Sequence, residues 1–267
     1  MNKQKIMCIG AVVMIIISTV LFVTLNKKAP EPKTLSEKPP ESEQKLPEPE
    51  THGKFYQKII CIDPGHGKTA RKEKEAIYPG ASEKKAANVS GAAGKILTEE
   101  ELNLQVGLKL KARLEAADAT VVITRTEHEC DMSNIERAEF ANKNNADIVV
   151  RLHADGSESA AVSGVSVLLP SEKRVSDGYL TKEIVQNSRR AGELILAAVC
   201  KNTGAKNRGT VERPDMTGFN WSAVPVTLLE MGFISNPDEE ANMATDEYQE
   251  KIVSGIIEGL EEYFGIN

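Results

Sequence analysis

The chain has 267 residues, of which 27% are charged and 40% hydrophobic, and its formal net charge is −6. This length allows one sizeable domain together with additional segments. The negative charge and the absence of a basic stripe argue against a nucleic-acid-binding protein. The four cysteines show no CxxC spacing, which argues against a zinc site built from thiolates.

Residues 7–25 form a nearly continuous apolar run that carries no charge and has lysines on both flanks. About 20 residues of helix suffice to cross a bilayer, so the run predicts a single-pass membrane anchor within residues 1–28. A cleaved signal peptide is the alternative, although the run ends without a small-residue cleavage site. The short preceding tail favours a topology in which the rest of the chain is extracytoplasmic.

The next segment is rich in proline. Six of the chain's twelve prolines lie between residues 30 and 49, interleaved with Glu, Lys and Ser. With almost no apolar side chains this segment cannot bury a core, and proline keeps it extended. The composition therefore predicts a disordered linker over residues 29–54, which holds a domain at residues 55–267 away from the membrane.

From residue 58 onward, predicted strands alternate with predicted helices. Strands are expected at residues 58–63, 120–124, 147–152, 163–169 and 225–230. Helices are expected at residues 99–117, 133–145, 181–202 and 246–264, with Ser133 as an N-cap and Glu136 three residues on. The alternation predicts an α/β fold: a single open, twisted, mostly parallel sheet flanked by helices on both faces.

Residues 70–97 do not fit this alternation and are rich in Lys, Glu, Ala, Ser and Gly. We expect a loop insertion next to the site. It either shapes a substrate groove, for example as a lid, or is a mobile surface loop.

Four residues carry candidate chemistry. His66, His153 and Glu230 lie at or just past the ends of predicted strands, and Glu99 lies at the start of a predicted helix. In open α/β sheets, sites gather beyond the carboxyl ends of the strands. Two imidazoles and one carboxylate can hold zinc and leave a position open for water, and a second carboxylate can take a proton from that water.

Each of these residues also has an ordinary explanation. His66 can be a turn residue between two glycines, and His153 a core histidine with satisfied hydrogen bonds. Glu99 belongs to a triplet of glutamates that complements a helix dipole, and spacing alone does not select one member as a ligand. Glu230 ends an apolar strand, where an unpaired carboxylate is costly and needs a partner or a chemical role.

Six segments, spread over residues 58–264, together resemble the catalytic domain of the zinc-dependent N-acetylmuramoyl-L-alanine amidases of the type-3 family. They are IDPGHG, EEELNLQVGLKLKARLE, VVITRT, SNIERAEFAN, VVRLHADG and VPVTLLEMGFISNPDEE. The resemblance implies that His66, Glu99 and His153 bind Zn²⁺ and that Glu230 is catalytic. The chain departs from the family at Lys68, where a second glycine is more common, and in the length of its 70–97 segment.

The resemblance further implies hydrolysis of the amide bond between N-acetylmuramic acid and L-alanine in peptidoglycan. Arg208 and Asn220, in loops before the last strand, are expected to contact glycan or peptide, although Arg208 can equally be structural. Two alternatives stay open at this point: a wall-binding or regulatory module without activity, and a zinc peptidase acting on another extracytoplasmic peptide. The sequence carries no signal for or against a protein activator.

Overall fold

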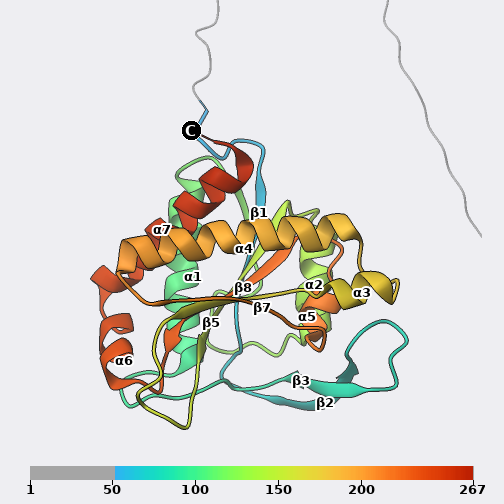
Figure 1. Cartoon of the computed structure of the whole chain (residues 1–267), viewed down its shortest axis with the longest axis horizontal. Helices are drawn as coiled ribbons and strands as arrows, with labels where there is room; N and C mark the ends of the chain where they lie inside the picture. The colour runs from blue at the N-terminus through green and yellow to red at the C-terminus, as the bar shows by residue number, and fades with distance from the viewer. Residues whose placement is uncertain (1–51, 267) are drawn as a thin grey trace, which may run out of the picture. The chain divides into compact units, whose positions relative to one another are not determined.

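The computed structural model describes residues 52–266 (Figure 1). The predicted anchor at residues 1–28 and nearly all of the predicted linker lie outside these residues. Within residues 52–266, no helix combines the length and the apolar character that a membrane crossing requires.

A six-stranded sheet forms the centre of the described part of the chain, in the order β4-β1-β5-β8-β6-β7. The strands are β1 (Ile59–Pro64), β4 (Thr120–Ile123), β5 (Ile148–Asp155), β6 (Val165–Leu169), β7 (Asn207–Glu212) and β8 (Val226–Phe233). Only the β6–β8 pairing is antiparallel, and the other four pairings are parallel. The predicted mostly parallel α/β sheet is therefore confirmed.

Helices cover both faces of this sheet, as predicted. The long helices α1 (Glu99–Glu115), α4 (Lys182–Thr203) and α7 (Asp246–Phe264) pack on one face, and Figure 1 shows α4 crossing the sheet. Two shorter helices, α2 (Asn134–Lys143) and α5 (Thr217–Asn220), pack on the other. The short helices α3 (Glu172–Ser176) and α6 (Pro237–Met243) complete the described fold.

Alternation along the strands explains why both faces bury apolar side chains. In β1, Ile60 and Ile62 join the core under α1, α4 and α7, whereas Cys61 joins the smaller core under α2 and α5. Successive side chains of a strand point to opposite faces, so a strand covered on both sides is apolar throughout. This arrangement brings the carboxyl ends of β1, β5 and β8 to one edge of the sheet.

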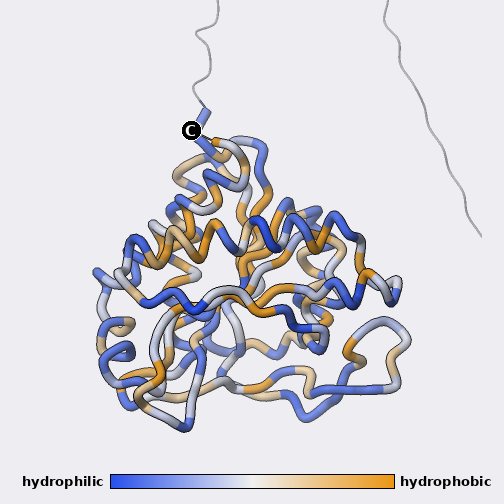
Figure 2. Tube along the Cα trace, viewed as in Figure 1, coloured by the Kyte–Doolittle hydropathy of each residue, from blue (hydrophilic) through white to orange (hydrophobic). Residues whose placement is uncertain are grey.

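The expectation of a loop over residues 70–97 is wrong for much of that segment. It contains β2 (Arg71–Ala76) and β3 (Lys84–Asn88), which pair as an antiparallel hairpin. The exposed residues of β2 are Lys72, Glu73 and Lys74, and those of β3 are Lys84 and Ala86, so neither strand shows the apolar alternation that marks a half-buried strand. Figure 2 shows the hydrophilic stretches of this segment.

The hairpin is fixed to the body of the domain by its backbone carbonyl groups. Trp221 Nε1 donates to the Ala76 carbonyl at 2.9 Å, and Asn134 Nδ2 donates to the Ala87 carbonyl at 2.9 Å. These bonds tie it to α2 and to the end of α5. The hairpin therefore lies beside the edge of the sheet where β1, β5 and β8 end, and it is joined to the rest of the domain along its length.

Candidate metal centre and active site

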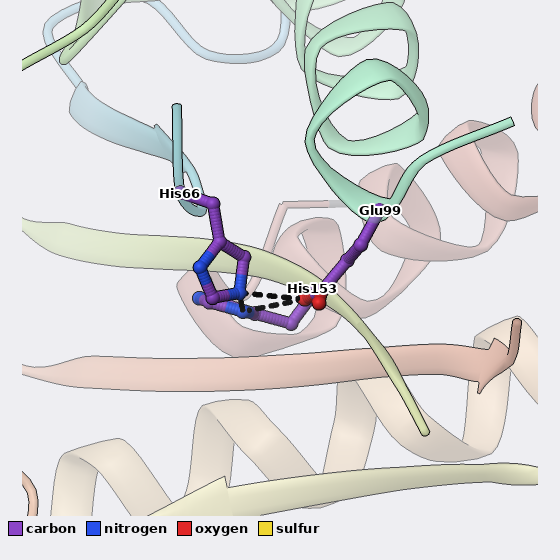
Figure 3. Close-up of side chains that lie close together, drawn as sticks. All are labelled: His66, Glu99 and His153. Atoms are coloured by element: carbon purple, nitrogen blue, oxygen red, sulfur yellow. Dashed lines mark hydrogen bonds and ion pairs between the residues drawn. The ribbon is translucent and has the colours of Figure 1, made fainter. Parts of the chain in front are cut away.

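Three side chains meet at the carboxyl ends of β1 and β5. Figure 3 shows His66 reaching in from the turn after β1, His153 from β5, and Glu99 from the first turn of α1. Glu99 Oε1 lies 2.9 Å from His66 Nε2 and 2.9 Å from His153 Nδ1, and the two nitrogens are 3.1 Å apart. Three potential ligand atoms thus face one another.

Glycines make room for this cluster. A Cβ on Gly65 would lie 2.3 Å from the ring of His153, and a Cβ on Gly91 would lie 2.7 Å from Glu99 Oε2. The ring of His153 leaves no room for a side chain at position 65, and Gly91 adopts a φ of 81°, which other residues rarely adopt, so both positions favour glycine. His66 itself adopts a φ of 64°, in the left-handed region that side chains rarely occupy. Strain of this kind persists where the surrounding structure holds a functional side chain in place.

The hydrogen bond at the far side of His66 fixes its tautomer. Its Nδ1 lies 2.7 Å from the carbonyl oxygen of Val89, which can only accept, so Nδ1 carries the proton. In the neutral ring, Nε2 then presents a lone pair toward the Glu99 carboxylate and toward His153 Nδ1. Lone pairs at such distances repel unless a proton or a cation lies between them. A second hydrogen bond of this kind is the usual support of a metal-binding histidine.

The three consecutive glutamates at the start of α1 make different contacts. Glu101 forms a capping box with Thr98 and closes the start of α1. Glu100 contacts His128 Nδ1 at 3.1 Å. Glu99 turns toward the two histidines, and its Oε2 accepts from the backbone nitrogen of Ala92 at 2.8 Å.

The donor set and its spacing fit a small divalent cation. Ligand atoms about 2.0–2.1 Å from a tetrahedral zinc ion are roughly 3.3 Å apart. The three separations here, 2.9 to 3.1 Å, are slightly shorter. Burial lowers the pKa of His153 to about 4, which keeps its ring neutral and able to ligate. Burial would raise the pKa of Glu99, but its contacts with His153 and His66 outweigh that effect and lower the pKa, so the carboxyl is ionised.

Glu230 lies beside this cluster on β8. It pairs in register with His153 of β5, and only 9% of its surface is exposed. Its Oε2 has no hydrogen-bond partner among the described residues. Burial raises the pKa of the Glu230 carboxyl well above its usual range, and Glu99 and Asp155 add to the rise. A buried carboxylate without a partner is costly, so its position indicates a chemical role.

Behind the cluster lies a buried ion-pair frame that the sequence did not reveal. Asp63, the residue before Pro64 in β1, accepts from Arg137 Nη1 at 2.6 Å and from Arg151 Nε at 2.7 Å. Burial alone would raise the pKa of Asp63, but the two guanidinium groups hold it far below its usual range. A signal for this frame was present, because each arginine stands inside one of the family-like strings.

The same frame holds the turn that carries His66. Arg137 Nη2 donates to the carbonyl of His66 at 2.6 Å. Arg125 donates to the carbonyls of Pro64 and Gly65 at 2.9 and 3.0 Å. Since these carbonyls are fixed by charged donors, the imidazole of His66 is presented from a rigid turn.

The two predicted substrate contacts both have partners within the chain. Arg208 Nη1 donates to the Ser163 carbonyl at 3.2 Å, and its guanidinium lies over the ring of Phe233. Asn220 is buried, and its Nδ2 donates to the Ile77 carbonyl of the hairpin at 2.8 Å. Contact of either residue with substrate stays a prediction.

Comparison with known proteins gives a consistent assignment. The family described as N-acetylmuramoyl-L-alanine amidase matches residues 60–262. The chain is 28% identical over 207 residues to the uncharacterized protein YqiI of Bacillus subtilis, covering 78% of this chain and 85% of YqiI. It is 27% identical over 205 residues to the N-acetylmuramoyl-L-alanine amidase LytC of Bacillus subtilis, covering 77% of this chain but only 35% of LytC.

The fold agrees with solved structures. The N-acetylmuramyl-L-alanine amidase Ami1 from Mycobacterium smegmatis superposes with a TM-score of 0.71 and 22% identity, covering 80% of this chain and 99% of Ami1. At this level of identity the likeness establishes the shared fold.

Proposed function

Because this chain belongs to the N-acetylmuramoyl-L-alanine amidase family, we propose that it is a cell-wall hydrolase. It cleaves the amide bond between N-acetylmuramic acid and the L-alanine of peptidoglycan stem peptides. The observation that carries the proposal is the convergence of His66, Glu99 and His153 beside the buried carboxylate of Glu230, whose Oε2 has no hydrogen-bond partner among the described residues. This constellation meets the requirements of a metal-assisted amide hydrolase.

His66 Nε2, Glu99 Oε1 and His153 Nδ1 would hold a zinc ion. Two histidines and one glutamate are a common catalytic zinc set and leave a position open. When bound, zinc supplies a Lewis acid that polarises a carbonyl group and makes water more acidic. The Val89 carbonyl orients His66, and the Ala92 backbone nitrogen orients Glu99.

Glu230 is the general base and then the general acid. It accepts a proton from the attacking water and returns that proton to the departing L-alanine nitrogen. A carboxyl whose pKa is raised by burial holds a proton more readily than an exposed one, which suits this double role. Its place on β8, a strand buried along its whole length, keeps the carboxyl from moving away.

We further propose that the enzyme acts outside the cytoplasm, where peptidoglycan lies. Residues 1–28 would anchor it as a single-pass membrane protein, and residues 29–54 would span the distance to the wall. Washing membranes with carbonate and detecting the chain in pellet or supernatant tests this topology. A chain released without detergent contradicts the anchor.

The function is tested by digesting purified peptidoglycan with the full chain, with added zinc or with a chelator. Products are identified by mass spectrometry, beside Glu230→Gln and a control, Glu193→Gln, which makes the same change on the exposed side of α4. We expect stem peptides with a free L-alanine amino terminus from the wild type and the control, and none with chelator or Glu230→Gln. Cleavage inside the stem peptide would contradict the proposal in favour of a peptidase, and binding without release would favour a wall-binding module.

A further inference from the structure

Two cations from separate parts of the chain share one carboxylate on the face of the sheet that carries Glu230. Arg213 Nε and Nη2 bond the two oxygens of Asp215 at 2.8 and 3.0 Å. Lys85 Nζ, from β3 of the hairpin, lies 2.5 Å from Asp215 Oδ2. The three side chains sum to one positive charge, and those of Arg213 and Lys85 are 39% and 41% exposed.

The backbone around Arg213 is rigid. Its nitrogen donates to the Leu169 carbonyl at 2.9 Å, which extends the pairing of β7 with β6 by one residue. The next carbonyl, that of Pro214, accepts from Arg174 Nε at 2.7 Å and from Asn220 Nδ2 at 3.0 Å. Asp215 then holds the guanidinium in a fixed orientation through a bidentate pair. The cation is thus pre-organised before any ligand arrives.

This cation pair lies on the same side of the sheet as the catalytic carboxylate. Leu229 and Met231 of β8 point into the core under α1, α4 and α7, so Glu230 between them points to the opposite face. The hairpin that carries Lys85 is tied to that opposite face through α2 and α5. Burial raises the pKa of Glu230, and the charge of Arg213 is one of those that oppose this rise.

We propose that Arg213 and Lys85 bind a carboxylate in the peptide part of the substrate, which makes them specificity-determining residues. An arginine has five N–H donors, and Asp215 accepts from two of those of Arg213. The other three have no acceptor among residues 52–266, so they are available to a ligand. The inference rests on the proposed function, because Glu230 returns its proton to the departing nitrogen. The peptide therefore leaves on the Glu230 side of the site, where this cation pair lies.

A direct binding measurement tests this inference without relying on turnover. The full chain is titrated, by calorimetry, with a synthetic peptide that begins with L-alanine and bears free carboxylates, and with its fully amidated counterpart. The variants are Arg213→Gln and Lys85→Gln. The control is Arg189→Gln. Arg189 lies on α4 and forms an ion pair with Glu212, the residue directly before Arg213, so this variant removes a neighbouring arginine without changing the proposed site.

We expect the wild type and Arg189→Gln to bind the carboxylate peptide about tenfold to a hundredfold more tightly than the amide. Arg213→Gln should bind both peptides alike, at the affinity of the amide, and Lys85→Gln should lose part of the preference. A wild type that does not distinguish the two peptides overturns the inference. The inference is also overturned if Arg213→Gln or Lys85→Gln loses affinity for both peptides equally and melts at a lower temperature. That result would mean that the two residues only hold the hairpin in place.

A kinetic measurement of KM and kcat distinguishes a failure of this inference from a failure of the proposed function. On peptidoglycan fragments, Arg213→Gln should raise KM for substrates with free peptide carboxylates, and this rise should exceed any change in kcat that follows from the loss of its charge near Glu230. On amidated fragments, the KM of Arg213→Gln should equal that of the wild type. If the wild type cleaves neither substrate but still prefers the carboxylate peptide in the titration, the proposed function fails while the binding site stands.

Discussion

The metal cluster and the ion-pair frame behind it are neighbours in the fold but differ in how their buried carboxylates are paired. In the frame, both oxygens of Asp63 bind guanidinium groups. In the cluster, three potential ligand atoms face one another, and among the described residues Glu230 Oε2 and His153 Nε2 have no hydrogen-bond partner. Arg151 Nη1 of the frame also has none, but its guanidinium is neutralised by Asp63, so we expect support from the paired Asp63 carboxylate and chemistry at Glu230.

Replacing Glu230 is expected to have the largest effect on activity. Glu230→Gln keeps the shape but cannot accept a proton, so kcat should fall by about 10²–10⁴-fold. Because the wild-type carboxyl is buried and its pKa is raised, its ionised form opposes folding above the unfolded pKa of about 4.3. The metal-free variant should therefore melt at or above the wild-type temperature at pH 7, as followed by circular dichroism. A strong loss of stability would mean that Glu230 belongs to the supporting frame instead.

Replacing Asp63 should have the opposite effect from replacing Glu230, because its main consequence is a loss of stability. Asp63→Ala leaves Arg137 and Arg151 as buried charges without a carboxylate partner, which costs about 3–5 kcal/mol in the free energy of unfolding. Urea denaturation measures this cost. Asp177→Ala is the matched control, because Asp177 also binds a buried arginine, Arg174, but its own side chain is 28% exposed, so a smaller loss is expected there.

The lowered pKa of Asp63 also predicts a loss of stability at acid pH. The pKa of Asp63 is lower in the folded chain, so its contribution to stability is fully present above the unfolded pKa of about 3.9. It is lost as the pH falls below that value toward the folded pKa. The stability of the wild type should therefore drop between pH 4 and pH 2 more steeply than that of Asp63→Asn, as measured by urea denaturation at each pH. Parallel curves for the two proteins would contradict this assignment.

Zinc should raise the melting temperature through the cluster alone. A ligand at 100 times its Kd stabilises the folded state by about 2.7 kcal/mol. His153→Ala should abolish this rise, whereas His128→Ala, which removes a histidine paired with Glu100, should keep it. Calorimetric scans with zinc and with chelator provide the test, and a zinc effect that survives in His153→Ala would place the ion elsewhere.

The smallest effect concerns the attachment of the hairpin. Trp221→Phe removes the hydrogen bond to the Ala76 carbonyl and should cost about 1 kcal/mol. Because Val89, whose carbonyl orients His66, directly follows β3, zinc affinity should weaken slightly in the same variant. Hydrogen exchange of β2 and β3 amides measures the loosening, and unchanged protection in both strands would contradict it.

Local patterns predicted what depends on local physics. The strand before Pro64 and the helix that begins at Glu99 follow from apolar spacing, and the Ser133 cap follows from its pairing with Glu136. The position of His66 and His153 at strand ends was enough to predict that they lie close together, as the structure shows.

What the sequence did not predict depends on tertiary partners. The strands β2 and β3 are mostly charged and gain their structure from carbonyl contacts with Trp221 and Asn134. Strand β7 is largely exposed and lies at the sheet edge, so its residues lack an apolar pattern. Arg151 lies in a buried strand only because Asp63 neutralises it, and no spacing rule connects residues so far apart in the chain.

Anomalous diffraction from zinc-soaked crystals of the protein would locate the metal ion. We expect one strong peak about 2.0–2.1 Å from His66 Nε2, His153 Nδ1 and Glu99 Oε1, with Glu230 beside its open side. A peak at His128 and Glu100, or ligation through His153 Nε2, would contradict the proposed metal centre.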